Sequence, residues 1–416
     1  MQKKQYQQQF INEQDDFSET IACEIVSAKD SKASGGCGAP SYVYKTVRFG
    51  KGEVIETLPE HDNNFNEKKR MCVQFVETYN KLLQTELNPE YCKRWSRRSK
   101  QVTSCGNLLQ FQGEKLAQTL FCKVRLCPMC SWRRALKICM HTREILTKML
   151  EDEEQSFKFL FLTLTVPNVS DKDLPSELSH LLGAWRKMTH VRGRNQYPID
   201  FNNNVLGWYR GLEITRNMDK YEVIYSTDLR TGKRIKLLKC DKDGNKIKNK
   251  NYLTWHPHFH CILVVPEDYD KQMLNRDYWL ERWRWATGDS TITQVKCEEF
   301  RPSKKVLENK KYQEKFTSEQ LQSLAIVSGV AEAAKYTVKS TDFYLDADAT
   351  KILDLALERR QLVAFGGIMS KYREILKLDD EIDGDLVSST SSPEDANLVK
   401  RCYAFSVGFN CYIKLH

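Results

Sequence analysis

The chain has 416 residues, of which 41% are hydrophobic and 29% are charged, an ordinary composition for a soluble globular protein of two or three domains. No apolar run approaches the ~20 residues that span a bilayer, and the opening MQKKQYQQQF lacks the apolar core of a signal peptide, so a cytoplasmic location without a membrane partner is expected. The net charge is +9. Because the segment 379–395 holds seven acidic and no basic residues, the rest of the chain carries +16, which suggests a polyanionic partner, most simply nucleic acid.

The first part of the chain is predicted to be a polar, irregular segment over residues 1–60, where SKASGGCGAPS has the composition of a loop. A basic, cysteine-rich and mainly helical region is expected over 61–150, in which a helix over 61–90 leads into the basic run KRWSRRSK. Such a run is typical of a solvated helix face, and also of a surface that contacts nucleic acid. The candidate DNA-contacting residues are Arg94, Arg97, Arg98, Arg125, Arg133 and Arg134.

Four cysteines of this region are spaced C-x16-C-x4-C-x2-C, at Cys105, Cys122, Cys127 and Cys130. In a reducing compartment, clustered cysteines are more often metal ligands than disulfide partners, and the pair CPMC has the spacing of a structural zinc knuckle. The wider spacings depart from the usual paired pattern, so both a structural Zn²⁺ site and a group of buried free thiols stay open as interpretations. Cys139 is a possible substitute ligand.

Residues 151–345 are predicted to form one domain of the α/β (α+β) class. FKFLFLTLTV, GWYRGLEITRN, HFHCILVV and TITQVKC are interpreted as strands, and DLPSELSHLLGAWRKMTHV, YWLERWRWA and SEQLQSLAIVSGVAEAAKYTVK as helices. This order favours a mostly antiparallel sheet with helices on one face, interrupted by a charged hairpin insertion over 217–252. The C-terminal region, 346–416, contains an acidic linker over 379–395 and then YAFSVGFNCYIKL, which alternates like one returning strand.

Three of the eight histidines stand at alternate positions in HPHFH, where a strand is predicted to begin. Alternate residues of a strand point to the same face, so His256, His258 and His260 share one face. Neighbouring histidines on one face stand ~6–7 Å apart, close enough to chelate one divalent ion. Glu213 is the candidate anionic ligand if GLEITRN lies beside this strand. The alternative is a polar strand edge with hydrogen-bonded histidines and an ordinary carboxylate.

Glu332, Tyr336 and Lys339 sit at positions i, i+4 and i+7 of the last predicted helix, so they share one face. A tyrosine there is normally part of a core or an interface. A carboxylate and an ammonium on the same helix face suggest a catalytic role for the tyrosine instead. A nearby cation and a metal-polarised phosphate both help a phenol of pKa ~10 to act as a nucleophile.

Three motifs occur in order: FLTLTVPNV, HPHFHCILVV and EAAKYTVKSTD. Together with FCKVRLCPMCSWRRALK they resemble the rolling-circle replication initiators of Gram-positive plasmids, within the HUH endonuclease superfamily. The resemblance covers roughly residues 100–345 and implies an HUH-type antiparallel sheet. It also implies that His258 and His260 hold a divalent metal, Mg²⁺ or Mn²⁺, which polarises the scissile phosphate at a plasmid origin. Glu213 is the expected third ligand, and His256 belongs to the motif without having to bind metal.

The same resemblance implies the roles of the three residues on the last helix. Tyr336 attacks the phosphate, forms a 5′-phosphotyrosine bond and frees a 3′-OH primer. Glu332 activates water for the terminating cleavage, and Lys339 neutralises charge at the phosphate. The expected partners are plasmid origin DNA, as a hairpin or single-stranded nick site, and a host helicase and polymerase, with a homodimer left open.

Two other functions stay open from the sequence. A conjugative relaxase or a single-strand transposase shares this chemistry, but the tyrosine of the common relaxase lies near the N-terminus, whereas Tyr336 lies far downstream of the histidines. The other is a catalytically silent origin-binding protein with a structural metal. The grouping of Glu332, Tyr336 and Lys339 on one helical face favours an enzyme, a metal-dependent DNA nickase and strand transferase.

Overall fold

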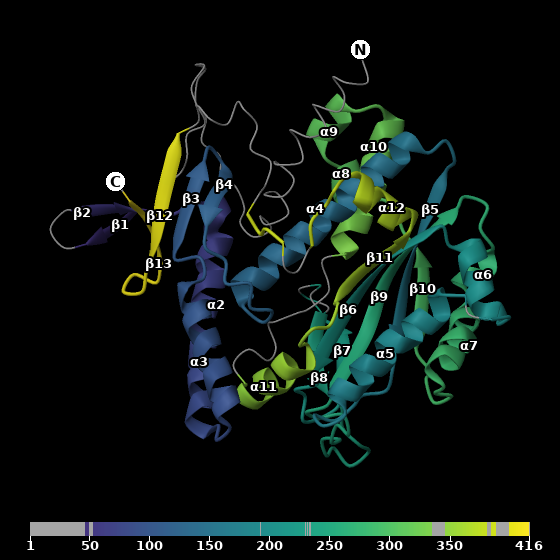
Figure 1. Cartoon of the computed structure of the whole chain (residues 1–416), viewed down its shortest axis with the longest axis horizontal. Coiled ribbons are helices and arrows are strands. Elements are labelled where there is room, and N and C mark those ends of the chain that lie inside the picture. The colour runs from purple at the N-terminus through teal and green to yellow at the C-terminus, as the bar shows by residue number, and fades with distance from the viewer. Residues whose placement is uncertain are drawn as a thin grey trace. The chain divides into compact units, whose positions relative to one another are not determined.

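The structure is a computed structural model that describes residues 46–49, 53–191, 193–228, 230, 232, 234–334, 346–380, 384–387 and 399–415 (Figure 1). The chain forms two compact units. We call Met1–Leu136 together with Asp380–His416 the cysteine unit, and Lys137–Asp379 the histidine unit. In the parts of the chain that the structure describes, no helix is long and apolar enough to cross a membrane.

The histidine unit is built on a five-stranded sheet in which every neighbouring pair is antiparallel, in the order β10-β5-β9-β6-β11. The strands are β5 Phe157–Thr165, β6 Gly207–Arg216, β9 Trp255–Pro266, β10 Val295–Glu299 and β11 Val363–Gly367. The central strand β9 is buried along Cys261–Val265, which explains the uninterrupted apolar run CILVV. The α/β class and the antiparallel sheet predicted from the sequence are therefore confirmed.

Helices cover the sheet face to which Phe259 points. Trp185 and Trp283 lie with their ring centroids 5.9 and 6.2 Å from the ring of Phe259. The three helices on this side are α5 Leu174–Thr189, α6 Gln196–Asn204 and α7 Arg276–Thr287 (Figure 1). Helix α10, Ser318–Ala333, ends near the opposite face, because Tyr209 Oη donates a hydrogen bond of 2.8 Å to the carbonyl oxygen of Ala334.

The charged insertion after β6 is a hairpin, as predicted. Strands β7 (Val223–Thr227) and β8 (Arg234–Leu238) pair antiparallel, and isolated bridges extend the hairpin toward residue 248. The histidine unit also contains the larger part of α4, Pro128–Asp152, and five short helices: η2 Lys271–Leu274, α8 Lys304–Leu307, α9 Lys310–Lys315, α11 Ala347–Ala356 and α12 Ile368–Ile375.

Strand β11 at the edge of the sheet was not predicted from the sequence. Its pairing with β6 places Gly366 against Trp208 so closely that a Cβ at Gly366 would lie 2.2 Å from the indole ring. Gly367 has a φ of +57°, a backbone conformation that glycine adopts without strain. The two glycines therefore allow the edge strand to approach β6.

The cysteine unit combines helices with a four-stranded antiparallel sheet in the order β13-β12-β3-β4. The helices are α2 Asn63–Thr85 and α3 Pro89–Ser104, and the first turns of α4 (Pro128–Asp152) also belong to this unit. The strands are β3 Leu108–Gln112, β4 Lys115–Thr119, β12 Lys400–Ser406 and β13 Cys411–Leu415. A short pair, β1 Thr46–Phe49 with β2 Glu53–Glu56, and the 3₁₀ turn η1 Glu60–Asp62 precede them.

The helical prediction for the start of this unit is confirmed by α2 and α3. Asn88 caps α3, because its side chain accepts a hydrogen bond of 2.9 Å from the backbone N–H of Glu90, and Pro89 opens the helix. The prediction of one returning strand for YAFSVGFNCYIKL is wrong. The segment makes two strands, β12 and β13, around a turn that contains Asn410 at a φ of +52°.

The units divide the chain differently from the sequence-based ranges, which end at 60, 150 and 345. The boundaries lie at 136/137, inside α4, and at 379/380. The C-terminal region 346–416 is split, because β11 pairs with β6 whereas β12 pairs with β3. Both pairings join segments far apart in the sequence, which local periodicity does not reveal. Part of the acidic linker, 381–383 and 388–395, lies outside the described residues.

Candidate metal and catalytic site

The pairing of β6 with β9 brings the predicted metal ligands together. In this register Glu213 lies opposite His258, and Gly211 lies opposite His260. Opposite residues of an antiparallel pair point to the same face, so the carboxylate stands beside both imidazoles. Gly211 has no side chain to fill the space in front of His260. The condition under which Glu213 was expected as a ligand, adjacency of the two strands, is therefore met.

The three side chains form a compact donor group. Glu213 Oε2 lies 2.8 Å from His260 Nε2 and 3.3 Å from His258 Nε2. The candidate ligand atoms of the three residues all lie within 4.8 Å of one another. Glu213 and His258 are buried, and His260 is partly open to solvent. Two imidazoles and one carboxylate are a donor set that suits a divalent transition metal or Mn²⁺ and leaves coordination positions for a substrate.

Each imidazole faces Glu213 with Nε2 and is oriented by a hydrogen bond at its second ring nitrogen, Nδ1. His258 Nδ1 lies 3.1 Å from the carbonyl oxygen of His256. A carbonyl only accepts, so Nδ1 donates, and Nε2, which faces Glu213, is the nitrogen that would bind a metal. His260 Nδ1 lies 3.2 Å from Thr163 Oγ1 on β5, and the His260 ring stacks on Phe161 at 5.3 Å.

Thr163 and Phe161 were missed as site residues in the sequence. The available signal was the alternation of FLTLT, because Phe161, Thr163 and Thr165 occupy one face of β5. That signal becomes useful only once the pairing of β5 with β9 is known, which places Thr163 opposite His260.

The electrostatics of the site favour an ionised Glu213 carboxylate. Burial raises the pKa of Glu213, but hydrogen bonds and charge from His258 and His260 outweigh it and lower the pKa to about 2. Burial, with a smaller contribution from His258, lowers the pKa of His256 to about 4. His256 stacks on His258 at 5.0 Å and lies outside the donor group, as its position in the motif allowed.

The histidine unit has a cleft at the donor group and a second cleft beside His256. A cleft of about 950 Å³ is lined by Phe161, Glu213, His260 and Ala333, among others. A second, of about 570 Å³, is lined by His256 and by polar side chains at the base of the hairpin insertion, among them Arg216, Asn217 and Lys236. The donor group is therefore reached from open space on the side of His260, and His256 lines the second cleft.

The structure describes only part of the predicted catalytic helix. Helix α10 confirms the helical prediction from Ser318 to Ala333. Tyr336 and Lys339 lie outside the described residues, and of Glu332 only the backbone, in the last turn of α10, is described. Ala333, directly after Glu332, lines the larger cleft together with Glu213 and His260.

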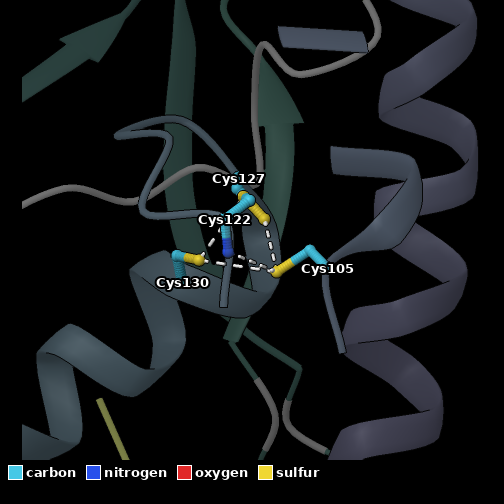
Figure 2. A group of neighbouring side chains, drawn as sticks. All are labelled: Cys105, Cys122, Cys127 and Cys130. Carbon is cyan, nitrogen blue, oxygen red and sulfur yellow. Dashed lines mark hydrogen bonds between the residues drawn. The ribbon is translucent and has the colours of Figure 1, made fainter. Parts of the chain in front are cut away.

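The four predicted cysteines come together in the cysteine unit (Figure 2). Cys105 Sγ lies 3.5 Å from Cys130 Sγ and 3.7 Å from Cys127 Sγ, and Cys122 Sγ lies 3.6 Å from Cys130 Sγ. All four sulfur atoms lie within 4.8 Å of one another, and none is in a disulfide. The substitute ligand Cys139 is not in the group, because it stands nine residues beyond Cys130 on α4, about 14 Å along the helix axis.

Two of the six candidate DNA-contacting arginines make contacts inside the cysteine unit. Arg134 is buried, and its guanidinium donates to the carbonyl oxygens of Lys123, Val124 and Arg125. Arg133 donates to the carbonyl oxygen of Leu386 at 3.0 Å and packs against the rings of three aromatic residues, Phe65, Phe121 and Trp132. The Arg134 guanidinium and Arg133 Nε therefore stabilise the fold of the cysteine unit.

The other arginines are accessible to different degrees. Arg97 is exposed on α3, whereas Arg94 and Arg98 are half-buried on its flank, with Arg94 lying over the ring of Trp95. Arg125 is half-buried in the loop before α4.

Comparison with known proteins matches most of the chain. A family model described as "Replication protein" matches residues 113–411, which include Glu213 and both histidines. A "Protein rep" from Bacillus amyloliquefaciens is 29% identical over 334 residues, covering 77% of this chain and 84% of that protein. A "Protein rep" from Lactiplantibacillus plantarum is 32% identical over 302 residues, covering 70% of this chain and 78% of that protein. No solved structure matches the chain.

Proposed function

Because the chain belongs to the replication protein family, we propose that it initiates rolling-circle replication of a plasmid by cutting one strand of the origin with a tyrosine nucleophile. The observation that carries this proposal is the donor group of Glu213, His258 and His260 at the edge of an open cleft. A protein that only recognises an origin has no need of such a group beside a cleft.

Glu213, His258 and His260 would hold the metal, Mg²⁺ or Mn²⁺. When bound, the metal polarises a phosphate oxygen and offsets the charge that builds up on it. The residues of the chain prepare this site. The carbonyl of His256 and the hydroxyl of Thr163 hold the two imidazoles with Nε2 toward Glu213, and the low pKa of Glu213 keeps its carboxylate charged at neutral pH.

Tyr336 is the proposed nucleophile. Its phenolate oxygen attacks phosphorus, the bond from phosphorus to the 3′-oxygen of the preceding nucleotide breaks, and that oxygen takes up a proton as the 3′-OH primer. The protein keeps the 5′-phosphate as a phosphotyrosine. The position of Tyr336 in the chain supports this assignment. Tyr336 follows Ala333, which lines the larger cleft, by three residues, and a three-residue segment spans at most about 10 Å.

Glu332 and Lys339 complete the proposed chemistry. Glu332 accepts a proton from the water that ends the cycle by hydrolysis, and Lys339 offsets phosphate charge during attack. Glu332 directly precedes Ala333 and so belongs to the turn of α10 that reaches the cleft. The hairpin insertion 217–252 holds ten basic and five acidic residues, and this excess of positive charge would bind the phosphates of the DNA backbone.

A covalent-adduct assay tests the proposal. The wild-type chain is incubated with Mn²⁺ and a single-stranded origin oligonucleotide, and the adduct is resolved on a denaturing gel and mapped by mass spectrometry. Tyr336→Phe keeps the ring and loses the attacking oxygen, so no adduct is expected. His260→Ala removes a ligand, and both adduct formation and nicking should fall by at least ~100-fold, because the metal supplies several kcal/mol of charge stabilisation.

Tyr344→Phe is the matched control, because it removes another phenol eight residues downstream. It should form the adduct as the wild type does. An adduct that persists in Tyr336→Phe, or that maps to another tyrosine, contradicts the assignment of the nucleophile. Origin binding without any nicking by the wild type would instead support the silent origin-binding protein.

A further inference from the structure

The cysteine group lies in the unit that does not contain the donor group of Glu213, so it needs an explanation of its own. Its members come from three elements: Cys105 caps the C-terminal end of α3, Cys122 follows β4, and Cys127 and Cys130 flank the start of α4. Figure 2 shows the four sulfur atoms directed toward a common centre. A link at this centre would tie together three elements that share no continuous secondary structure.

The sulfur spacing fits a tetrahedral ion. A zinc–sulfur bond of ~2.3 Å in a regular tetrahedron gives sulfur–sulfur edges of about 3.8 Å. Three of the edges here are 3.5, 3.6 and 3.7 Å. The residues Cys127 to Cys130 form the knuckle, in which the N–H of Ser131 donates to the carbonyl oxygen of Cys127 at 2.8 Å and starts the helix.

A buried cation beside the group points independently to negative charge there. The Lys69 side chain is 2% exposed, and Nζ donates 2.8 Å hydrogen bonds to the carbonyl oxygens of Thr103 and Cys105. Its further contact is with the ring of Phe405, and among the described residues it has no carboxylate partner. A buried ammonium needs a counter-charge to offset its lost hydration. Four thiolates around one Zn²⁺ carry a net charge of −2 and would supply it.

We propose that Cys105, Cys122, Cys127 and Cys130 bind one structural Zn²⁺, with Lys69 as the buried counter-charge of the thiolates. A fifth thiol, Cys72, lies 3.6 Å from Cys127 Sγ and stays outside the tetrahedron as a sulfhydryl donor to that thiolate. The ion fixes the end of α3 and the start of α4 to β4. Its chemistry is structural, because four protein ligands leave no position for a substrate.

Metal content of the purified full-length chain tests the site. After brief dialysis against EDTA, the wild type should retain one zinc per chain by atomic spectrometry. Cys122→Ser and Cys130→Ser should lose it. Cys72→Ala, which removes the fifth thiol, and His260→Ala, which alters the donor group of the other unit, should both retain it. Equal zinc retention in all five proteins would overturn the ligand assignment.

Two measurements on the wild type keep the test decisive if a cysteine variant fails to fold. Replacement of zinc by Co²⁺ should give thiolate-to-cobalt charge-transfer bands and the intense visible bands of a tetrahedral ion. The four thiols should react with Ellman's reagent more slowly than the exposed Cys240, and a mercurial should release one zinc as they react. A folded wild type with no zinc, no cobalt bands and four reactive thiols would reject the site, whatever the outcome of the nicking assay.

Discussion

At the scale of single residues, a hydrogen bond at Nδ1 determines the orientation of each candidate metal-binding histidine, His258 and His260. His258 is oriented by a backbone carbonyl, which no substitution of a side chain removes. His260 is oriented by the hydroxyl of Thr163, which one substitution can remove. The two imidazoles therefore differ in how easily their orientation can be tested.

Thr163→Val removes the hydroxyl and keeps the β-branched shape. His260 should lose its preferred orientation, and metal affinity should fall ~10–100-fold, as is typical when the partner of a ligating histidine is removed. Nicking measured against Mn²⁺ concentration should shift accordingly and recover at high Mn²⁺. Thr165→Val is the matched control, since Thr165 lies on the same face two residues on but donates to the carbonyl of Gln294. Similar shifts for both variants would contradict a specific role of Thr163.

Asp62, at the start of α2, gives a prediction on pH. Burial raises its pKa to about 6, although His61 and Arg401 partly offset the effect. The native state therefore takes up a proton between pH ~6 and ~4 that the unfolded chain does not. The buried Asp62 carboxylate thus destabilises the native state above pH 6, and this destabilisation disappears as the pH falls toward 4. Asp62→Asn should raise the free energy of unfolding at pH 7.5 by about 2 kcal/mol, with no gain near pH 4. Denaturant titrations at both pH values check this, and a difference that does not change with pH would count against it.

At the scale of elements, helix α3 has two distinct faces. Trp95, Ser99 and Val102 are buried, with the Trp95 ring stacked on Tyr79 of α2 at 6.1 Å. The exposed basic residues lie on the opposite face, at the spacing i, i+4 and i+7: Lys93, Arg97 and Lys100. This face is narrower than the basic run in the sequence, because Arg94 and Arg98 turn toward the flank.

Replacing Lys93, Arg97 and Lys100 by Gln should weaken DNA binding about equally for origin and unrelated sequences. If each contacts one phosphate, the slope of log K against log salt should become less negative by about 0.9 per residue. Fluorescence anisotropy at several salt concentrations measures the slope. Lys81→Gln, an exposed lysine on α2, is the control and should leave the slope unchanged. A triple variant with the wild-type slope would show that this face does not touch DNA.

At the scale of the whole molecule, the two units carry different kinds of candidate metal site. The donor group of the histidine unit has three ligands and an adjoining cleft, whereas the cysteine group has four buried or half-buried sulfur atoms. The first should exchange its metal readily, and the second should not.

Brief treatment with EDTA should therefore abolish nicking of supercoiled origin plasmid and leave origin binding intact. Added Mn²⁺ should restore nicking without added zinc. Parallel nicking and gel-shift assays on the same samples separate the two activities, with zinc content measured as the control. Loss of origin binding together with nicking, while zinc is retained, would mean that binding also depends on the exchangeable metal.

Local patterns in the sequence determined most of the elements and the faces of the side chains. Strand alternation placed His258 and His260 on one face, and helical spacing identified α5, α7 and α10, because both patterns depend on neighbours a few residues apart. The spacing of CPMC marked the knuckle for the same reason. The family resemblance in the motifs agrees with the match over residues 113–411.

Only the tertiary structure decided which segments meet. The register of β6 with β9 brought Glu213 to the histidines across the 217–252 insertion, and the pairing of β5 with β9 brought Thr163 to His260. The tertiary structure also turned Arg134 inward, where it donates to carbonyl oxygens of the loop before α4. It paired β12 with β3, in which Lys400 lies opposite Gln112. Pairings over such separations depend on the packing of complete sheets, which no short window of sequence contains.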